Sequence, residues 1–404
     1  MKIAMINSVS GYGSTGKLVA MLGKTEGVQS RIYYGRKHDS SGGDAVKISD
    51  DLGFLSHVVH TFVSDRHGFF NTVSTMKMVE DLKVFDPDLI HLHNLHGYYL
   101  DVNTLFSYLK SVHTPVIWTL HDCWAFTGHC AHYTSVGCEK WKTACIDCPA
   151  LLHYPPTLNP AQTEKNRLLK KQLFTSPAAD QMTIVTPSQW LKAEAEQSFL
   201  GKYRIKAIPN GIDHRIFHPV SSSFKEQHGI QDRFMILAAA GNWYKEKGTE
   251  DLKKLAHDLP EGCVLAVVGA DRRFAASLAG PNVITVSRTE RAEELAEIYS
   301  AADVFINLTK EDTFPTVNIE ALSCGCPVIT YAIGGSPEII TEKTGKSVPG
   351  EDLDALKEMI EDMQKGKVRF DRQDCEARGR EFSRERMLGE YRALYDEMVN
   401  GVRK

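Results

Sequence analysis

Short apolar runs alternate with helical or loop segments along the chain, and the pattern starts twice. In the first half, five runs rich in β-branched and apolar residues have the character of buried parallel strands: KIAMINS, SRIYYG, DLIHLH, PVIWTL and MTIVTP. After residue 213 the pattern restarts with FMILAAA, CVLAVV, NVITV, DVFINLT and PVITYA. The alternation predicts an α/β protein of two doubly wound, Rossmann-like domains, with ligands in the cleft between them at the carboxyl ends of the strands.

Two segments show the periodicity of amphipathic helices. In residues 288–302, Leu295, Ile298 and Tyr299 have the i, i+3, i+4 spacing of a helix with one apolar face. Residues 382–398 carry a similar stripe, formed by Met387, Tyr391 and Leu394. We therefore expect a helix within each of these segments.

Composition narrows the class of protein. A chain of 404 residues with 42% hydrophobic and 24% charged residues is long enough to bury two cores. Its net charge of −4 gives no electrostatic case for binding nucleic acid. The apolar run at the start, MKIAMINSVSGYG, is too short for a signal peptide, and no later run reaches the length of a membrane span. We expect a cytoplasmic protein, and the sequence leaves contact with the inner face of a membrane open.

The stretch KEDTFPTVNIEALSCGCP has the design of an anion site. Pro315 suits the first turn of a helix, which leaves the N–H groups of Thr316 and Val317 free to point at a phosphate. Glu320 lies about one turn further on, where a carboxylate could accept hydrogen bonds from a ribose diol, and Asp312 precedes the helix. The alternative is an ordinary surface helix with an acidic loop before it.

A glycine-rich loop follows the first predicted strand and favours a rival function. Gly11, Gly13 and Gly16 spell G-x-G-x-x-G, a pattern that binds the pyrophosphate of a dinucleotide. A dinucleotide fold also needs an acidic residue about 20 positions on, and the second strand ends without one. Arg36 at that end could suit a 2′-phosphate, so an NADP-dependent oxidoreductase is an alternative.

Six motifs in order resemble one family. Residues 311–328, ED-x-FP-x-V-x-IEAL-x-CG-x-PV, resemble the acidic-x7-Glu signature of the retaining GT-B glycosyltransferases of family four. GNWYKEKG at 241–248 resembles that family's G-R-L-x-x-x-K-G turn, and 207–219, AIPNGIDHRIFHP, its P-N-G-V-D segment. VTPSQWLK at 185–192, DLIHLHNLH and VIWTLHD resemble three of its strand ends. The details look closest to transferases of the colanic acid and exopolysaccharide type.

The resemblance implies both architecture and activity. It implies an acceptor-side domain over residues 1–213, joined by a C-terminal helix at 384–404, and a nucleotide-sugar-binding domain over 214–383. The implied reaction is retaining, metal-independent transfer of a hexosyl-type group from a UDP- or GDP-linked sugar to a glycan or lipid-linked acceptor in polysaccharide biosynthesis. A non-catalytic sugar-nucleotide binder that kept the fold is a further alternative.

The resemblance also implies which residues act. The main-chain N–H groups after the acidic loop would meet the diphosphate, Lys247 would neutralise it, and Glu320 would hold the ribose. The implied catalytic residues are His121, Lys247 and Asp312. The implied donor site contains Gly13, Ser14, Gly16, Asn242, Lys247, Glu311, Asp312, Phe314, Pro315, Thr316, Val317 and Glu320.

Two departures from the family pattern affect these assignments. Asn242 stands where the family usually has an arginine, so either Lys245 supplies the missing cation or Lys247 acts with less help. Asp312 stands where the family often has a glutamate, with Glu311 adjacent as a substitute. A shorter first acid could change which sugar is accepted.

Histidines cluster at two neighbouring strand ends of the first half. By resemblance, His121 contacts the donor sugar, and the acceptor side is lined by His91, His93, Asn94 and His96. His91 and His93 project from the same side of a strand, so an H-x-H metal site of a hydrolase is an alternative.

Four cysteines crowd one insertion, GHCAHYTSVGCEKWKTACIDCP. Cys130, Cys138, Cys145 and Cys148 resemble a structural zinc knot, because the last two form C-x-x-C. Free buried thiols are an equally weighted interpretation, and a disulfide is a third. Further residues offer alternative zinc ligands: Cys123, His129 and His132.

Overall fold

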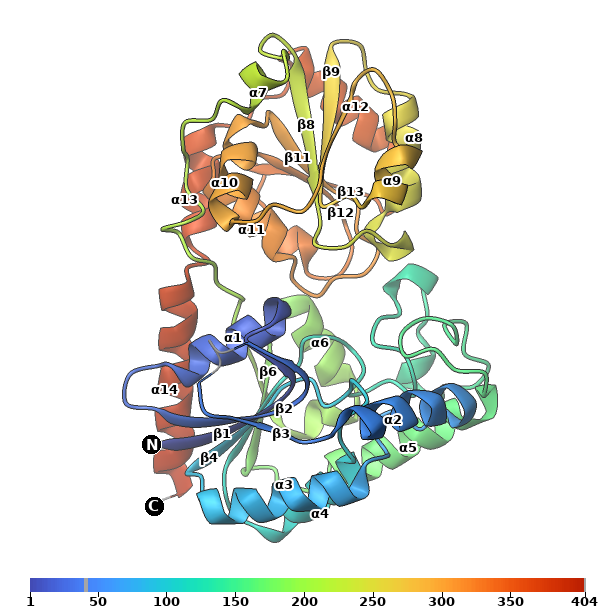
Figure 1. The fold of residues 1–404 in the computed structure, drawn as a ribbon, viewed down its shortest axis with the longest axis vertical. Helices are drawn as coiled ribbons and strands as arrows, with labels where there is room; N and C mark the ends of the chain where they lie inside the picture. Colours follow the sequence, from blue (N-terminus) through green and yellow to red (C-terminus); the bar gives the residue numbers. More distant parts are fainter. Residues whose placement is uncertain (40–42, 403–404) are drawn as a thin grey trace. The chain divides into compact units, whose positions relative to one another are not determined.

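The computed structural model describes residues 1–39 and 43–402, and its chain divides into two compact units (Figure 1). Unit 1 comprises residues 1–208 together with the C-terminal segment from Leu388, and unit 2 comprises Pro209–Met387. Each unit is a parallel sheet covered by helices, as the double alternation of apolar runs predicts.

The described part of unit 1 is built on seven parallel strands in the order β3-β2-β1-β4-β5-β6-β7. Their bounds are β1 Lys2–Ser10, β2 Gln29–His38, β3 Ala45–Lys47, β4 Leu89–Leu92, β5 Val116–Thr119, β6 Met182–Thr186 and β7 Arg204–Ala207. Five of them coincide with the predicted runs. The outermost strands, β3 and β7, lack an apolar run of their own because each is short and mostly half-exposed at a sheet edge.

Helices fill the intervals between these strands. They are α1 Gly13–Gly23, α2 Asp51–Ser64, α3 Thr72–Phe85, α4 Val102–Ser111, α5 Thr163–Phe174 and α6 Gln189–Gln197. The C-terminal helix α14, Arg384–Val402, starts at the end of unit 2 and belongs to unit 1 from Leu388 on. The predicted apolar stripe of α14 is buried. Tyr391 and Tyr395 of α14 bond to Thr119 and His91 of the sheet, at 3.1 Å and 2.9 Å between side-chain atoms.

The insertion between β5 and α5 is irregular and held mainly by aromatic packing. It contains three single-turn 3-10 helices, at Thr134–Val136, Lys140–Lys142 and Pro160–Gln162. Trp124, Phe126 and Trp141 are buried in it, and the rings of Phe126 and Trp141 lie 4.9 Å apart. These side chains belong to the hydrophobic core of unit 1 and anchor the insertion to it.

The described part of unit 2 carries six parallel strands in the order β10-β9-β8-β11-β12-β13. Their bounds are β8 Phe234–Ala239, β9 Cys263–Val268, β10 Val283–Val286, β11 Val304–Asn307, β12 Val328–Tyr331 and β13 Gly345–Val348. Its helices are α7 Phe224–Gln227, α8 Thr249–His257, α9 Arg272–Ser277, α10 Ala292–Ala301, α11 Thr316–Ser323, α12 Leu353–Gln364 and α13 Arg372–Arg380. The predicted helix within 288–302 is α10, with Ile298 and Tyr299 buried. Strand β13, with the sequence GKSV, has one apolar side chain and gives no strand signal.

The strand order places a topological switch point in each unit. In unit 1 the chain winds in opposite directions from β1 and from β4, which are neighbours, and in unit 2 from β8 and β11. In open α/β sheets, ligands bind at the carboxyl ends of the strands beside such a point. The loops after β1, β4, β8 and β11 are therefore where functional residues are expected.

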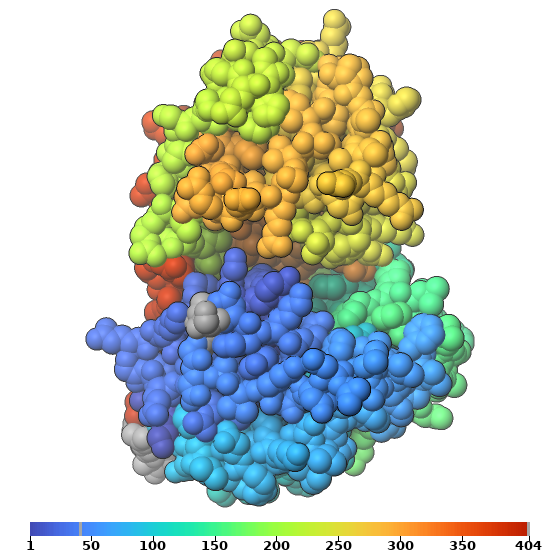
Figure 2. Space-filling model, in the orientation of Figure 1, coloured from blue at the N-terminus to red at the C-terminus, as the bar shows by residue number. Residues whose placement is uncertain are grey.

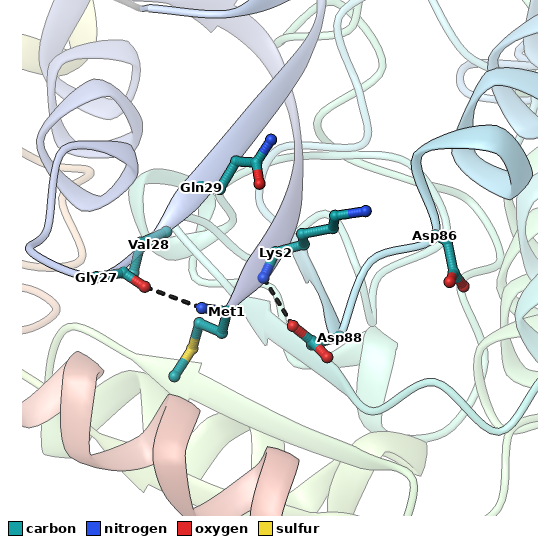
Figure 3. A pocket seen from close by; sticks show the side chains of 7 residues that line it. All are labelled: Met1, Lys2, Gly27, Val28, Gln29, Asp86 and Asp88. Atoms are coloured by element: carbon teal, nitrogen blue, oxygen red, sulfur yellow. Dashed lines mark hydrogen bonds between the residues drawn. The ribbon is translucent and has the colours of Figure 1, made fainter.

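A surface hollow of unit 1 lies at the opposite end of the sheet (Figure 3). It is lined by Met1, Lys2, Gly27, Val28, Gln29, Asp86 and Asp88. The amino group of Met1 donates to the carbonyl of Gly27 at 2.9 Å, and the amide of Lys2 donates to Asp88 at 2.8 Å. Because this hollow is at the amino ends of the strands, it takes no part in the site described below.

Candidate functional site

Lys247 reaches the switch point of unit 2 from the loop after β8. It ends a single 3-10 turn, Lys245–Lys247, and is followed by Gly248 with a φ of +78°. A Cβ at Gly248 would lie 2.3 Å from the carbonyl oxygen of Leu308, so only glycine fits against the loop after β11. The amide of Lys310 donates to the carbonyl of Glu246 at 2.7 Å and ties the two loops together.

The second loop presents the start of α11. Thr316 is the first helical residue and Pro315 occupies the position just before it, so the helix begins one residue later than the sequence suggests. The amide groups of Thr316 and Val317 have no acceptor within the helix, as at every helix start. Phe314 and Pro315 are buried, whereas Thr316 and Val317 are half-buried. An anion at this helix start would meet main-chain donors and the positive end of the helix dipole.

Lys247 and Asp312 are paired with each other. The Nζ of Lys247 lies 2.8 Å from Oδ2 of Asp312, and both side chains are about a quarter exposed or less, at 24% and 21%. The other carboxylate oxygen of Asp312 accepts the amide of Phe314 at 3.1 Å. Burial by itself would lower the pKa of Lys247, but the attraction of Asp312 outweighs it and the pKa is raised. Lys247 is therefore a fully charged ammonium at neutral pH.

Glu320 lies on the first turns of α11 and is braced from behind. Its Oε2 accepts the hydroxyl of Tyr299 at 3.3 Å. Tyr299 is fully buried, and burial together with the Glu320 carboxylate raises its pKa well above the ordinary value, so the hydroxyl stays a donor. One carboxylate oxygen is thus fixed by α10 while Glu320 remains half-buried.

The residues around this pair occupy different environments. Asn242 and Lys245 are exposed, whereas Glu311 is half-buried. The structure pairs Asp312 with Lys247, and not with Lys245. Lys247 rather than Lys245 is thus the cation next to the start of α11.

The glycine loop of unit 1 has two kinds of glycine. Gly13 begins α1 with a φ of +66°, and it is exposed together with Ser14. Gly16 is buried in the first turn of α1, where an added Cβ would lie 3.0 Å from the side chain of Val9 and 3.3 Å from the amide nitrogen of Gly11. Gly16 thus packs α1 onto β1, which differs from the place in the donor site that the resemblance implies for it. Of the three donor-site residues expected in this loop, Gly13 and Ser14 are exposed.

His91 belongs to the core, contrary to its expected place on the acceptor side. Its ring is fully buried, with Nδ1 2.9 Å from the hydroxyl of Tyr395 and Nε2 2.8 Å from Oγ1 of Thr119. Burial lowers the pKa of His91 to about 3, so the ring is neutral. Both nitrogens are used in holding α14 to β4 and β5. The sequence could not show this, because Tyr395 lies more than 300 residues away.

His93 and His121 are brought together at the ends of β4 and β5. Nδ1 of His93 lies 3.1 Å from Nε2 of His121, and the two rings stack with centroids 5.4 Å apart. Burial lowers the pKa of His121 to about 4 and that of His93 well below its ordinary value. Both rings are therefore neutral near pH 7, and each can donate or accept a hydrogen bond without carrying a charge.

His96 is the centre of a small polar cluster at the same edge. Its Nε2 lies 2.6 Å from Oδ2 of Asp122, and its Nδ1 lies 3.3 Å from the hydroxyl of Tyr154 in the insertion. Burial by itself would raise the pKa of Asp122, but His96 and the amide of Trp124 outweigh it and lower the pKa to about 2. A hollow at this edge is lined by His93, Asn94, His96, His121, Asp122 and Trp124, among others.

Three residues of this cluster could not be assigned from the sequence. Asp122 follows His121 directly, but its partner could not be foreseen. Tyr154 and Trp124 come from an insertion whose irregular path no periodicity predicts. Their one sequence signal is the density of aromatic and histidine residues between 121 and 154.

The metal-site interpretations are not supported by the arrangement of ligands. Among the described residues no group of three or more His, Cys, Asp or Glu side chains is placed to hold a metal ion. This applies to the predicted zinc knot of Cys130, Cys138, Cys145 and Cys148 and to the H-x-H pair, since His91 uses both ring nitrogens in other bonds. All four cysteines are free thiols, with Cys130 and Cys145 buried. Burial raises the pKa of Cys130 well above that of an ordinary thiol.

Two family models match, one in each half of the chain. Residues 24–215 match the model described as Glycosyltransferase Family 4, and residues 220–382 match the one described as Glycosyl transferases group 1. The chain is 30% identical over 276 residues to the putative colanic acid biosynthesis glycosyl transferase WcaC of Escherichia coli, a match that covers 66% of this chain and 65% of that protein. A GDP-mannose-dependent phosphatidylinositol monomannoside mannosyltransferase of Mycolicibacterium smegmatis is 27% identical over 46% of this chain and 53% of its own. The chain thus spans between half and two thirds of these relatives.

Solved structures share the fold. Sucrose-phosphate synthase from Thermosynechococcus elongatus superposes with a TM-score of 0.71 at 20% identity, covering 99% of both chains. Anabaena HepE in complex with UDP gives a TM-score of 0.69 at 15% identity, covering 98% of this chain and 100% of that one. Nothing in these comparisons supports the oxidoreductase alternative. The two parallel-sheet α/β units, both family models and the shared fold agree: the chain belongs to the family-four glycosyltransferases of GT-B fold.

Proposed function

We propose that the protein transfers a hexosyl-type sugar from a UDP- or GDP-linked donor to a hydroxyl group of a glycan or lipid-linked acceptor in polysaccharide biosynthesis. The donor is assigned to unit 2 and the acceptor to unit 1. The observation that carries the proposal is the Lys247 ammonium, held by Asp312 beside the start of α11 at the switch point of unit 2. A cation next to main-chain amides is suited to a diphosphate.

The assigned residues divide the work of binding the donor. Lys247 and the amides of Thr316 and Val317 are assigned to the diphosphate. Glu320, braced by Tyr299, is assigned to the ribose diol. Asp312, with Glu311 beside it, is assigned to hydroxyl groups of the sugar. The fixed positions of these charges support transfer without a catalytic metal, because charge on the leaving diphosphate is stabilised by groups already in place.

The reaction we propose retains the configuration of the sugar. The bond from the anomeric carbon to the phosphate oxygen breaks, and a bond from that carbon to the acceptor oxygen forms on the same face, through an oxocarbenium-like state. The acceptor proton passes to the departing phosphate oxygen. His121, as the neutral partner of His93, is assigned to a sugar hydroxyl.

The nucleotide and the acceptor class are proposals that rest on relatives. HepE was solved with UDP and with UDP-glucose, whereas the mannosyltransferase relatives are named for GDP-mannose. We assign the acceptor side to Asn94 and to the cluster of His96, Asp122 and Tyr154, while His91 is excluded from direct contact by its buried bonds.

The stereochemical and metal proposals are tested on the sugar released by slow donor hydrolysis. Proton NMR of the released sugar in the presence of EDTA is expected to show the anomer of the donor before mutarotation. The inverted anomer, or activity only with added Mg²⁺ or Mn²⁺, would contradict the proposal. A protein that binds the donor and neither hydrolyses nor transfers it would be the non-catalytic binder of the alternative.

We also propose that unit 1 contacts a membrane through α2. None of the described helices is long and apolar enough to cross a bilayer. Helix α2 nevertheless exposes an apolar stripe on one face, formed by Leu52, Leu55, Val59, Phe62 and Val63, which are between 41% and 75% exposed. The chain carries no Lys, Arg, Asp or Glu between Asp51 and Asp65. Residues 51–64 are among the blue atoms at the surface in Figure 2. An uncharged, exposed apolar helix face suits a lipid surface that holds a lipid-linked acceptor.

A further inference from the structure

Lys170 is buried although lysine is among the side chains that burial penalises most. It lies on α5 with a relative exposure of 1%, and it is the one lysine or arginine in the buried class among the described residues. Removing an ammonium from water costs several kcal/mol in proteins unless other groups satisfy it. The contacts that satisfy Lys170 therefore show what it is placed to hold.

The hydrogen bonds of Lys170 go to the irregular loop that follows β5. The Nζ of Lys170 donates to the carbonyl of Trp124 at 2.8 Å and to that of Thr127 at 3.2 Å. It also lies 3.7 Å from the centre of the Trp124 ring, close enough for a cation–π interaction. Burial lowers the pKa of Lys170 to about 7, and the buried carboxylate of Asp65 partly offsets this by favouring the charged form. Lys170 thus fixes both the backbone and the ring of Trp124.

Trp124 passes this restraint on to the polar cluster. Its amide donates to Oδ1 of Asp122 at 2.9 Å, and Oδ2 of Asp122 holds Nε2 of His96 at 2.6 Å. Trp124 therefore accepts a hydrogen bond from Lys170 with its carbonyl group and donates one to Asp122 with its amide group. His121, which precedes Asp122, lies on the same short segment.

We propose that Lys170 is a positioning residue for the acceptor side of the site, acting through Trp124 and Asp122 on His96. This role rests on the proposed function, which assigns His96 to the acceptor. Lys170 itself touches no reacting atom. Its side chain satisfies the carbonyl groups of Trp124 and Thr127, which a strand or helix would otherwise pair with main-chain amides.

The test compares Lys170→Met with Lys171→Met, which removes the exposed lysine next to it on the same helix. Methionine keeps the unbranched stem of Lys170 and removes the ammonium. Removing the Lys170 donor leaves the buried carbonyl groups of Trp124 and Thr127 without this partner, and an unsatisfied buried polar group is destabilising. We therefore expect Lys170→Met to fold with a lower thermal midpoint than the wild type, while Lys171→Met keeps the wild-type midpoint.

The first readout does not depend on transfer activity: it is the set of NMR signals from the imidazole ring of His96. Two-bond ¹H–¹⁵N spectra of the ¹⁵N-histidine-labelled full chain, with His96→Gln supplying the assignment, report the tautomer and hydrogen bonding of the ring. In Lys170→Met we expect the His96 signals to move and those of His218, in unit 2, to stay. In Lys171→Met both sets should match the wild type.

Transfer kinetics provide the second readout. A misplacement of about 1 Å can cost on the order of 100-fold in rate, so we expect Lys170→Met to lower kcat/KM for transfer by roughly 10- to 100-fold with unchanged affinity for the free nucleoside diphosphate. If Lys170→Met shifts the His96 signals but the wild-type protein shows no transfer, the positioning role stands and the proposed function is overturned. A folded Lys170→Met with unmoved His96 signals would overturn the positioning role. If Lys170→Met does not fold, the same spectra and rates are measured on Lys170→Gln, whose shorter side chain keeps an N–H donor. Unmoved His96 signals in that variant would likewise overturn the positioning role.

Discussion

The ammonium of Lys247 lies 2.8 Å from a carboxylate oxygen of Asp312, so two residues assigned to different parts of the donor form one ion pair. The pair spans the loops after β8 and β11, which are the neighbouring central strands of unit 2. A diphosphate that binds Lys247 must therefore share the ammonium with Asp312 or displace it. In the proposed site the carboxylate would then be available to the sugar hydroxyls, so capture of the diphosphate would be coupled to recognition of the sugar.

Asp312→Asn should separate the two roles of this pair. Losing the competing carboxylate leaves Lys247 to the diphosphate, so we expect the affinity for the free nucleoside diphosphate to be unchanged or several-fold higher. Transfer should fall at least 10-fold, because the amide is a weaker acceptor for sugar hydroxyls. Calorimetry and transfer rates measured on the same preparation check this. Weaker diphosphate binding in Asp312→Asn would contradict the account of the pair.

Lys247→Ala should lower transfer at saturating donor, because the charge on the leaving diphosphate loses its nearest cation. A charge-assisted contact contributes about 1.5–3 kcal/mol, which corresponds to roughly 10- to 100-fold. Lys245→Ala is the matched control, since Lys245 is exposed on the same short turn. An equal loss in Lys245→Ala would show that Lys245 also binds the diphosphate. Lys245 would then supply the cation that is missing at Asn242.

Glu320→Ala should weaken nucleotide binding by roughly 10- to 100-fold, because the ribose loses a charged acceptor. Tyr299→Phe removes the hydroxyl that braces Glu320 at 3.3 Å, and we expect a smaller loss of the same kind. Titration calorimetry of the two variants gives the comparison. A larger loss in Tyr299→Phe than in Glu320→Ala would show that Glu320 supports the fold and does not bind the ribose.

Acid should destabilise unit 1 through its buried histidines. Burial lowers the pKa of His57 and of His91 to about 3, and that of His121 to about 4. Since the unfolded chain protonates a histidine near pH 6.5, each of these groups favours unfolding once the pH falls below that value, until the folded pKa is reached. At pH 5 the cost is on the order of 2 kcal/mol for each buried ring. Scanning calorimetry at pH 7.5 and pH 5.0 should show a clear fall in the lowest unfolding midpoint, and an unchanged midpoint would contradict this.

The membrane proposal predicts that vesicle binding depends on the α2 stripe. Leu55→Glu with Val59→Glu places two charges on that face, and we expect it to abolish co-sedimentation with phosphatidylcholine vesicles that contain about 30% phosphatidylglycerol. Val84→Glu, on the exposed side of α3, is the control and should bind like the wild type. If the stripe instead joins two copies of the chain, the wild type will be a dimer by light scattering, the double variant a monomer, and neither will bind vesicles.

The sequence contains most of the fold because buried parallel strands need continuous apolar runs. Strands such as β8 and β11 are visible for that reason, whereas β3, β7 and β13 are short edge strands whose pairing with a neighbour, not their composition, defines them. The same distinction, between a pattern along the chain and a contact in the fold, applies to the residues of the site. The chain order of Lys247, Asp312 and Glu320 follows a family pattern, and the structure brings the first two together.

Side-chain partnerships across the fold could not be predicted. His91 looked like a site residue because it is polar and at a strand end, yet Tyr395 and Thr119 occupy both its nitrogens. The contacts of Asp122 and Lys170 could not be foreseen, because Trp124, which bonds to both, lies in an irregular insertion. Such pairings depend on tertiary contacts between residues that are distant in sequence, so no local pattern of residues reports them.

The most direct test of the central claim is a calorimetric titration of the native protein with UDP, GDP, ADP and NADP, without added metal. The account predicts that one nucleoside diphosphate, UDP or GDP, binds and that its binding is greatly weakened or lost in Glu320→Ala. Binding of NADP alone, unaffected by Glu320→Ala, would contradict it and return the loop at Gly11, Gly13 and Gly16 to a dinucleotide.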